Sequence, residues 1–431
     1  MHFSKSISCL LALAALQPCG ASTLGLESAV QTALANNRGL QAARFAAAEA
    51  QGRLSASGVW KNPEFEFSGM SDFAFGSQGA GAFTIGLHQE FPLTSRLSLA
   101  REAGRIDLLR ALREIRNHER LLVLEVRHAS IAVLAAQARE AALRELLEAS
   151  KKSKALAQER LAAGQAALSE KSLALVQELR VANDLESARM DKDIALLGLK
   201  TLLGLGAAEP LRLSDSLAGA LEKLAPLADS APASVHRPDV DLLLLESEKA
   251  GVEAALARAE AWEGVRIGIE YTYDRNMDEP EGLGTDNFLG VAVSIPLPVW
   301  DRNAGRVEER KAAREASVAR LRAAKLDMEN TLAADLQRVG LLEKRLAAFD
   351  SKTIWPVSAA LAEMQAGFES GLVDARDVAA MRAQLGELRL GRIGLQAELA
   401  NALAQLESTT GAHPSIRKNY LAQNPKKETL P

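Results

Sequence analysis

Cysteine is nearly absent from the 431-residue sequence, and both cysteines, Cys9 and Cys19, lie within the first 21 residues. The rest of the chain can form no disulfide, so its stability must come from packing or assembly. The six histidines are scattered without close ligand spacing, which argues against a transition-metal site built by the protein. The sequence also lacks a Gly-x-Ser-x-Gly element, a phosphate-binding loop and an acid–base constellation. We therefore expect neither enzymatic activity nor a cofactor.

Aromatic residues and long apolar runs are also scarce. Aromatics make up 4% of the chain, and Ala, Leu, Glu and Arg dominate the middle of each half, which favours long helices over compact cores. After the first 21 residues, no uninterrupted apolar run approaches the ~18 residues of a membrane-spanning helix. Any membrane crossing must then be made by strands. The formal net charge of −4 argues against nucleic acid as a partner.

Residues 1–21 have the pattern of a secretory signal peptide. Lys5 precedes an apolar run over Ile7–Leu16, and cleavage is expected after Ala21. A lipoprotein signal acylated on Cys19 is the alternative, although Pro18 fits that pattern poorly. Both interpretations predict an exported protein.

The chain contains two copies of one unit. Trp60–Phe67 is echoed by Trp262–Ile269, an offset of 262 − 60 = 202. Later landmarks keep the same order with a slightly larger offset, namely Pro92 and Pro296, Gly164 and Gly371, and Gly204 and Gly411. We expect a first repeat over 22–215, a second repeat over 232–411, and a disordered tail over 412–431.

Each repeat is predicted to begin with a helix, followed by two strands, at 64–75 and 82–92 in the first copy and at 265–275 and 286–296 in the second. Apolar and polar residues alternate along them, as in Phe65 and Phe67 against Glu64 and Glu66. Their lengths suit strands that cross a membrane. Four strands cannot close a barrel, and an open edge in lipid leaves backbone groups unsatisfied, so the sheet must close by oligomerisation.

Long helices follow the strands. From Leu97 to Ala163 there is no proline and one glycine, which predicts a single helix of roughly 100 Å at ~1.5 Å per residue. Spacings of three and four predict a coiled-coil seam on it, broken by Glu140. The seam comprises Leu122, Val126, Ala129, Val133, Ala136, Leu143 and Leu147. The return helix Leu168–Leu203 is expected to present Leu175, Leu179, Ala182 and Leu185 on one side.

Glycines mark the tips of the two predicted helical hairpins, and Pro356 predicts a kink in the second hairpin. A carboxylate follows each tip glycine after six residues. The tips are either a docking or gating surface or plain loop ends. The candidate tip residues are Gly164, Glu170, Gly371, Asp374 and Asp377.

Carboxylates on the polar strand faces are candidate lumen residues. In an oligomer they would repeat by symmetry as rings that attract cations. Ordinary solvated charges are the alternative for each of them. The candidates are Glu64, Glu66, Asp72, Glu90, Glu270 and Asp274.

With these features the chain resembles the TolC-like outer-membrane efflux protein family over nearly its whole length after the signal. Leu26–Leu40 resembles the opening helix, with Asn37-Arg38 where the family has Asn-Pro, and Arg237-Pro238-Asp239 resembles the start of the second copy. Pro296–Gly305 resembles the heavy-metal efflux branch typified by CzcC. Both tips resemble the family pattern Gly-x-x-Ser-x-x-Asp, with Ala167 and Asp374 replacing the serine.

The resemblance implies a mainly α fold with a small β part, internally duplicated, whose two β-hairpins complete a transmembrane barrel on trimerisation. It implies a homotrimer with one twelve-stranded barrel in the outer membrane of a Gram-negative cell and a helical periplasmic tunnel. The implied partners are a periplasmic adaptor (membrane fusion) protein and an inner-membrane RND-type pump. The expected function is passive efflux, with heavy-metal cations as candidate substrates. A non-transporting coiled-coil envelope scaffold or an adaptor protein is the alternative, and a soluble periplasmic monomer would favour the scaffold.

Overall fold

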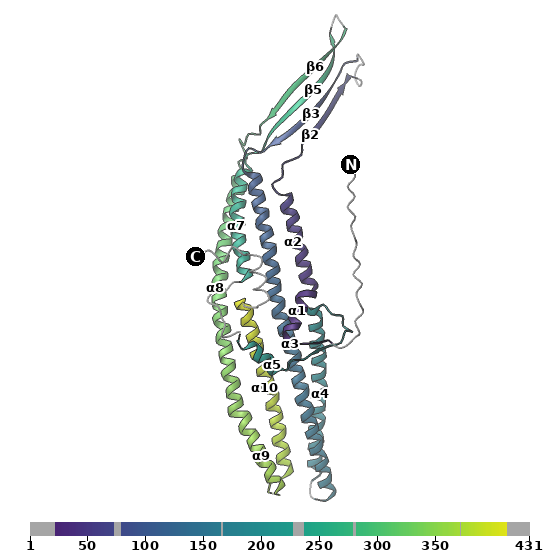
Figure 1. The fold of residues 1–431 in the computed structure, drawn as a ribbon, viewed down its shortest axis with the longest axis vertical. Helices are drawn as coiled ribbons and strands as arrows, with labels where there is room; N and C mark the ends of the chain where they lie inside the picture. Colours follow the sequence, from purple (N-terminus) through teal and green to yellow (C-terminus); the bar gives the residue numbers. More distant parts are fainter. Residues whose placement is uncertain are drawn as a thin grey trace. The chain divides into compact units, whose positions relative to one another are not determined.

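The computed structural model describes residues 22–72, 79–164, 167–226, 237–278, 282–370 and 372–411 (Figure 1). The expected signal peptide with Cys19, the candidate Gly371 and the tail over 412–431 lie outside these residues. The chain divides into two compact units. Unit 1 contains Met1–Asn37, Leu122–Asp229 and Arg338–Ala404, and unit 2 contains Arg38–Leu121, Ser230–Gln337 and Gln405–Pro431.

The described residues of unit 1 are helical apart from one short pair of strands and the connecting turns. β1 (Ser22–Leu24) and β4 (Leu211–Leu213) pair in parallel, which the sequence did not lead us to expect. Asp215 follows β4 and accepts a hydrogen bond from the backbone N–H of Leu26 at 2.8 Å, which ties it to the start of a helix. In the part of unit 1 that the structure describes, the helices wholly within the unit are α1 (Leu26–Asn36), α4 (Leu168–Leu203), α5 (Leu217–Leu224) and α9 (Trp355–Glu369).

The first helical hairpin consists of α3 (Arg96–Ala162) and α4. Leu143 of the predicted seam is buried against Val181, Leu185 and Ala188 of α4. Of the α4 residues expected on one side, Leu175 and Leu179 are exposed while Leu185 is buried. α4 buries one apolar stripe against its neighbours in the chain, and its other apolar stripe stays exposed in one chain.

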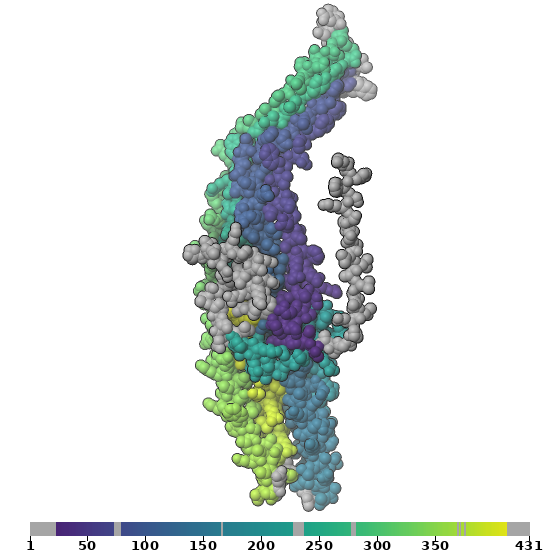
Figure 2. Space-filling model, viewed as in Figure 1, coloured from purple at the N-terminus to yellow at the C-terminus, as the bar shows by residue number. Residues whose placement is uncertain are grey.

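The second helical hairpin consists of α8 (Ala304–Phe349), a π-helical turn over Asp350–Ile354, α9 and α10 (Ala375–Thr410). The π turn ends two residues before Pro356. The sequence predicts a kink at Pro356, because proline has no N–H to donate to the helical hydrogen bonds. Leu361 of α9 packs on Val378 and Leu385 of α10. In unit 1, α10 (yellow) lies between α9 and the α3–α4 hairpin (Figure 2).

Unit 2 contains one antiparallel sheet of four strands in the order β2-β3-β5-β6 (Figure 1). The strands are β2 (Glu64–Ser71), β3 (Gly81–Phe91), β5 (Val265–Asp278) and β6 (Gly282–Ser294). The two hairpins join through β3 and β5, whose register runs from Gly81 opposite Arg275 to Phe91 opposite Val265. The two halves of the duplicated sequence therefore build one sheet together.

Several strand boundaries differ from the prediction. The ladder between β5 and β6 continues to Asp278 opposite Gly282, whereas the sequence suggested a loop over Arg275–Asp286. Polar residues in that stretch do not interrupt the ladder, because its hydrogen bonds are made by the backbone. β2 ends at Ser71, and the expected strand residues Phe73 and Phe75 lie outside the described residues.

Two further helices of unit 2 are α2 (Arg38–Ala56) and α7 (Pro238–Ala259). Ala47 and Ala50 of α2 pack on Ala111 of α3, so small side chains allow these helices to approach closely. Within the described residues, one helix, α3, has an 18-residue window apolar enough to cross a membrane. Half of that window is buried inside the protein.

Candidate functional site

The tip of the first helical hairpin turns at Gly164. Its φ is +73°, and a Cβ built there would have no atom within 4 Å. This position needs glycine for its left-handed backbone rather than for space. Gly371, the expected counterpart, lies outside the described residues.

An arginine joins the two tips within unit 1. The Arg160 guanidinium of α3 lies 2.5 Å from the Asp374 carboxylate and 3.4 Å from that of Glu170. Asp374 also accepts a hydrogen bond from the backbone N–H of Arg376 at 3.4 Å, and so caps the first turn of α10. The hydrogen bond to Asp374 raises the pKa of Arg160. The Asp374 carboxylate thus caps the N-terminus of α10 and also pairs with Arg160 of the neighbouring hairpin.

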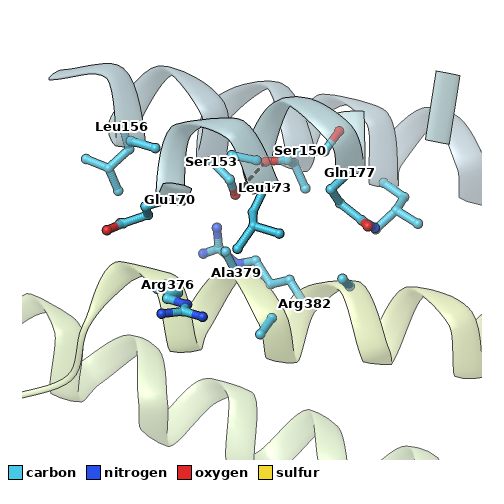
Figure 3. A pocket seen from close by; sticks show the side chains of 15 residues that line it. Ser150, Ser153, Leu156, Glu170, Leu173, Gln177, Arg376, Ala379 and Arg382 are labelled. Carbon is cyan, nitrogen blue, oxygen red and sulfur yellow. Dashed lines mark hydrogen bonds between the residues drawn. The ribbon is translucent and has the colours of Figure 1, made fainter. Parts of the chain in front are cut away.

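Behind this ion pair, α3, α4 and α10 surround a groove with a cavity volume of ≈ 300 Å³ (Figure 3). Leu173 of α4 points toward α10, whose Arg376 and Arg382 lie along the opposite side. Small residues leave the room for the groove: Ala149, Ala157, Ala174, Ala379, Ala380 and Ala383. The groove combines a small apolar floor with charged side chains, which suits a protein segment better than a compact polar ligand.

Two of the sequence-predicted tip residues, Glu170 and Asp374, meet at Arg160. Asp377 lies in the first turn of α10 and is exposed. The six-residue spacing suggested Glu170 and Asp377 as counterparts, but Arg160 instead pairs Glu170 with Asp374. Sequence reasoning considered only carboxylates and missed Arg160, although it stands four residues before the turn glycine.

The polar face of the sheet in unit 2 gathers most of the predicted lumen carboxylates. Glu64 is opposite His88, while Glu66 and Glu270 are both opposite Gly86, so these side chains share one face. Asp274 belongs to the same face, opposite Ala82 and Asp286. Asp72 lies beyond the end of β2, and its carboxylate accepts a hydrogen bond from the backbone N–H of Ala80 at 3.2 Å.

Basic side chains that the sequence analysis did not single out neutralise part of this face. Arg266 lies 3.1 Å from Glu64, and Lys61 lies 2.7 Å from Glu90, which also pairs with Arg96. Glu66 and Glu270 instead lie close to His88, at 3.3 Å and 3.6 Å from its Nε2 atom. Among the described residues, no group of three or more His, Cys, Asp or Glu side chains could hold a metal ion.

The opposite face of the sheet is apolar and exposed in the single chain. Phe65 of β2 is 70% exposed and Leu289 of β6 is 80% exposed. Tryptophans stand where this sheet meets the helices: Trp60 before β2, Trp262 before β5 and Trp300 after β6. All three are exposed, and Trp60 contacts Phe91 edge to face, with ring centroids 5.7 Å apart. One face of the sheet therefore suits an apolar environment and the other suits water.

The family model described as Outer membrane efflux protein matches the chain twice, over residues 29–205 and 232–412. No curated protein matches the sequence.

Solved structures share the fold at low sequence identity. A structure of CusC is 18% identical, with a TM-score of 0.73, and the match covers 92% of this chain and 95% of that one. The Campylobacter jejuni CmeC outer membrane channel is 14% identical, with a TM-score of 0.70 and coverages of 98% and 97%. The open state of the Neisseria gonorrhoeae MtrE outer membrane channel is 17% identical, with a TM-score of 0.65 and coverages of 90% and 88%.

Proposed function

Because the chain belongs to the outer membrane efflux protein family, we propose that it is the outer-membrane channel of a tripartite efflux system. It conducts substrates passively to the exterior from a periplasmic adaptor and an inner-membrane RND-type pump, with no enzymatic step of its own. The observation that carries this proposal is the four-stranded sheet, which has an exposed apolar face, a charged face and two open edges.

The open edges require partner strands. Among the described residues, β2 and β6 each pair on one side only. An unpaired edge in lipid leaves backbone N–H and C=O groups unsatisfied at several kcal/mol each. Copies of the chain supply the missing strands when β6 of one protomer pairs with β2 of the next. Three copies, the number implied by the family resemblance, give one barrel of twelve strands.

The apolar face then meets lipid and the charged face lines the lumen. The three tryptophans before and after the strands support this orientation, because indole rings prefer the interface between membrane and water. In the proposed channel the helical part of the chain extends from this interface into the periplasm.

Exposed apolar residues on α4 support assembly in the helical part as well. One row of them recurs at spacings of three, eleven, four and three, as expected for a helix face that packs on a second partner. The row consists of Val176, Leu179, Met190, Ile194 and Leu197. A neighbouring protomer covers this row in the proposed homotrimer.

At the tips, the Arg160–Asp374 ion pair holds the two hairpins of one protomer together, and the adaptor docks beside it in the groove under Leu173. Arg160→Gln should loosen the tips and raise single-channel conductance. Lys151→Gln is the matched control, because Lys151 pairs with Glu148 on the exposed surface of the same helix. Equal conductance in the two variants would contradict a latch at Arg160.

Purified oligomer in planar bilayers tests the conduit directly. We expect stepwise conductance together with a heat-modifiable band on a gel. Absence of conductance, with a soluble monomer that needs no detergent, would instead favour the scaffold alternative.

A matched pair of variants tests which face meets lipid. Val291→Lys places a charge on the apolar face of β6 and should destabilise the inserted barrel by ~2–4 kcal/mol if it lies near the bilayer midplane. Ala292→Lys places the same charge on the polar face and should leave the heat-modifiable band intact. The reverse order would refute the orientation.

Heavy-metal cations are the candidate substrates. The likeness of Pro296–Gly305 to the metal branch and the carboxylates of the polar face support them. A deletion strain should become sensitive to a subset of divalent metals and regain resistance with the wild-type gene. Sensitivity to organic compounds alone would reject metals as the substrate class.

A further inference from the structure

We propose that His88 is a proton-controlled charge switch that sets the cation selectivity of the polar face of the sheet. The inference rests on the proposed conduit function, since it concerns what the lumen admits. It names a residue that the predicted carboxylate rings did not include.

His88 lies flat against the sheet because its neighbours have no side chains. The residue is 6% exposed, although it belongs to the polar face. A Cβ at Gly268, directly opposite on β5, would lie 2.1 Å from its Nδ1 atom, and a Cβ at Gly86 would lie 2.7 Å from its Nε2 atom. Real Cβ atoms do not approach other atoms so closely. Two glycines on adjacent strands thus make the recess that holds the imidazole.

The recess lies between the carboxylates of Glu66 and Glu270. Nε2 of His88 lies 3.3 Å from Glu66 on β2 and 3.6 Å from Glu270 on β5. Neither carboxylate has another basic group within ion-pair distance in the part of the chain that the structure describes.

The other charges that face His88 are already paired. Glu64 on β2 pairs with Arg266 on β5, and Glu90 on β3 pairs with Lys61 and Arg96. The uncompensated charge around the imidazole therefore comes from Glu66 and Glu270.

The second ring nitrogen is not used to anchor the side chain. Nδ1 is buried and makes no hydrogen bond within the described residues. A buried structural histidine commonly donates or accepts through both nitrogens. Here the ring is held by shape, and its ion-pair partners among the described residues are Glu66 and Glu270.

In the proposed switch, protonation of the His88 imidazole changes the charge of this cluster. Histidine is the side chain whose charge ordinarily changes between pH 5 and 8. With neutral His88, Glu66 and Glu270 leave two uncompensated negative charges on each protomer. With protonated His88, the imidazolium pairs with both and leaves one. Acidification therefore weakens the attraction of the lumen for cations.

Reversal potentials across planar bilayers with a KCl gradient test the switch on the full-length oligomer. A carboxyl group in water stays ionised between pH 8 and pH 5.5. We expect the cation-to-anion permeability ratio of the wild type to fall about twofold or more over this range. His88→Gln should keep one ratio at both pH values. His118→Gln, which removes an exposed histidine of α3, should behave as the wild type does.

A second variant keeps the histidine and removes its partners. The double change Glu66→Gln and Glu270→Gln should lower the ratio already at pH 8, and the heat-modifiable band verifies that each variant is assembled. A wild-type permeability ratio that is independent of pH, or an unchanged pH response in His88→Gln, would overturn the switch. If current still flows in these experiments, the conduit itself is not contradicted. Absence of current in every variant would overturn the conduit, and the switch with it.

Discussion

Glu140 of α3 offers a sharp test of how the first helical hairpin is held together. It interrupts the predicted coiled-coil seam, yet it is 6% exposed. Three basic side chains surround its carboxylate: Arg144 at 2.5 Å, Lys192 at 2.8 Å and Arg189 at 3.6 Å. The hydrogen bond from Lys192 lowers the pKa of Glu140 below its ordinary value of 4.5, although burial opposes this shift.

Glu140→Gln removes the charge and keeps the shape. Losing the charge-assisted hydrogen bond from Lys192, a largely buried partner, costs about 1.5–3 kcal/mol. Arg144 and Arg189 are more exposed and can turn to water, so each adds between about 0 and 1 kcal/mol. We therefore expect a destabilisation of about 2–4 kcal/mol. The matched control is Glu145→Gln, because Glu145 is 77% exposed and 3.8 Å from Arg389.

Hydrogen exchange of the assembled protein measures this loss locally. Since 1.4 kcal/mol corresponds to a factor of ten, exchange in the middle of α3 and α4 should accelerate by about thirtyfold or more in Glu140→Gln. Glu145→Gln should change it little. Because the folded-state pKa of Glu140 is lowered, its contribution is present above pH 4.5 and is lost as the pH falls through that lowered pKa. Thermal unfolding at pH 7 and near pH 4 should therefore show a smaller difference between wild type and variant at the lower pH. Equal exchange in Glu140→Gln and Glu145→Gln would refute the reasoning.

Three further changes have defined outcomes. Asp215→Asn should lower the melting temperature at pH 7 and lower it less in acid. Hydrogen bonds from Leu26 and Lys223 lower the pKa of the Asp215 carboxyl from 3.8. The stabilisation by this carboxylate is therefore lost as the pH falls through that lowered pKa. Gly204→Ala should be more destabilising than Gly164→Ala by more than ~1 kcal/mol, as measured by denaturant unfolding. Both positions have positive φ, but of the two only a Cβ at Gly204 would meet a backbone oxygen, that of Asn36, at 2.7 Å. Arg392→Lys removes the two parallel hydrogen bonds that Arg392 donates to Asp350, the first residue of the π turn. The change should cost ~1 kcal/mol and speed hydrogen exchange in that turn, as measured by mass spectrometry.

The strands and long helices could be predicted because their patterns are local. Alternation of period two along 64–71 and 265–275 decides which side chains share a face, whichever strand pairs with them. The absence of proline from 97 to 162 likewise leaves a helix uninterrupted whatever it packs against. The extension of β5 to Asp278 could not be read in this way, because it depends on a partner strand that supplies backbone hydrogen bonds.

The candidate site was likewise predictable in part, namely where its features are local in the sequence. The carboxylates at the tips and on the polar face are visible as residue types at regular positions. Their partners come from distant segments, as Arg160 meets Asp374 across 214 positions and Arg266 meets Glu64 across the sheet. No sequence period links such pairs.

By itself, the sequence determined the duplicated order of helix, strand pair and helical hairpin, and the need for a closed sheet, because these follow from periodicity and from the hydrogen-bonding demands of the backbone. Only the tertiary structure decided that the two halves share one sheet through β3 and β5, and that His88 lies over Gly268 between Glu66 and Glu270. Strand pairing and ion pairing depend on which distant segments meet, and folding alone brings them together.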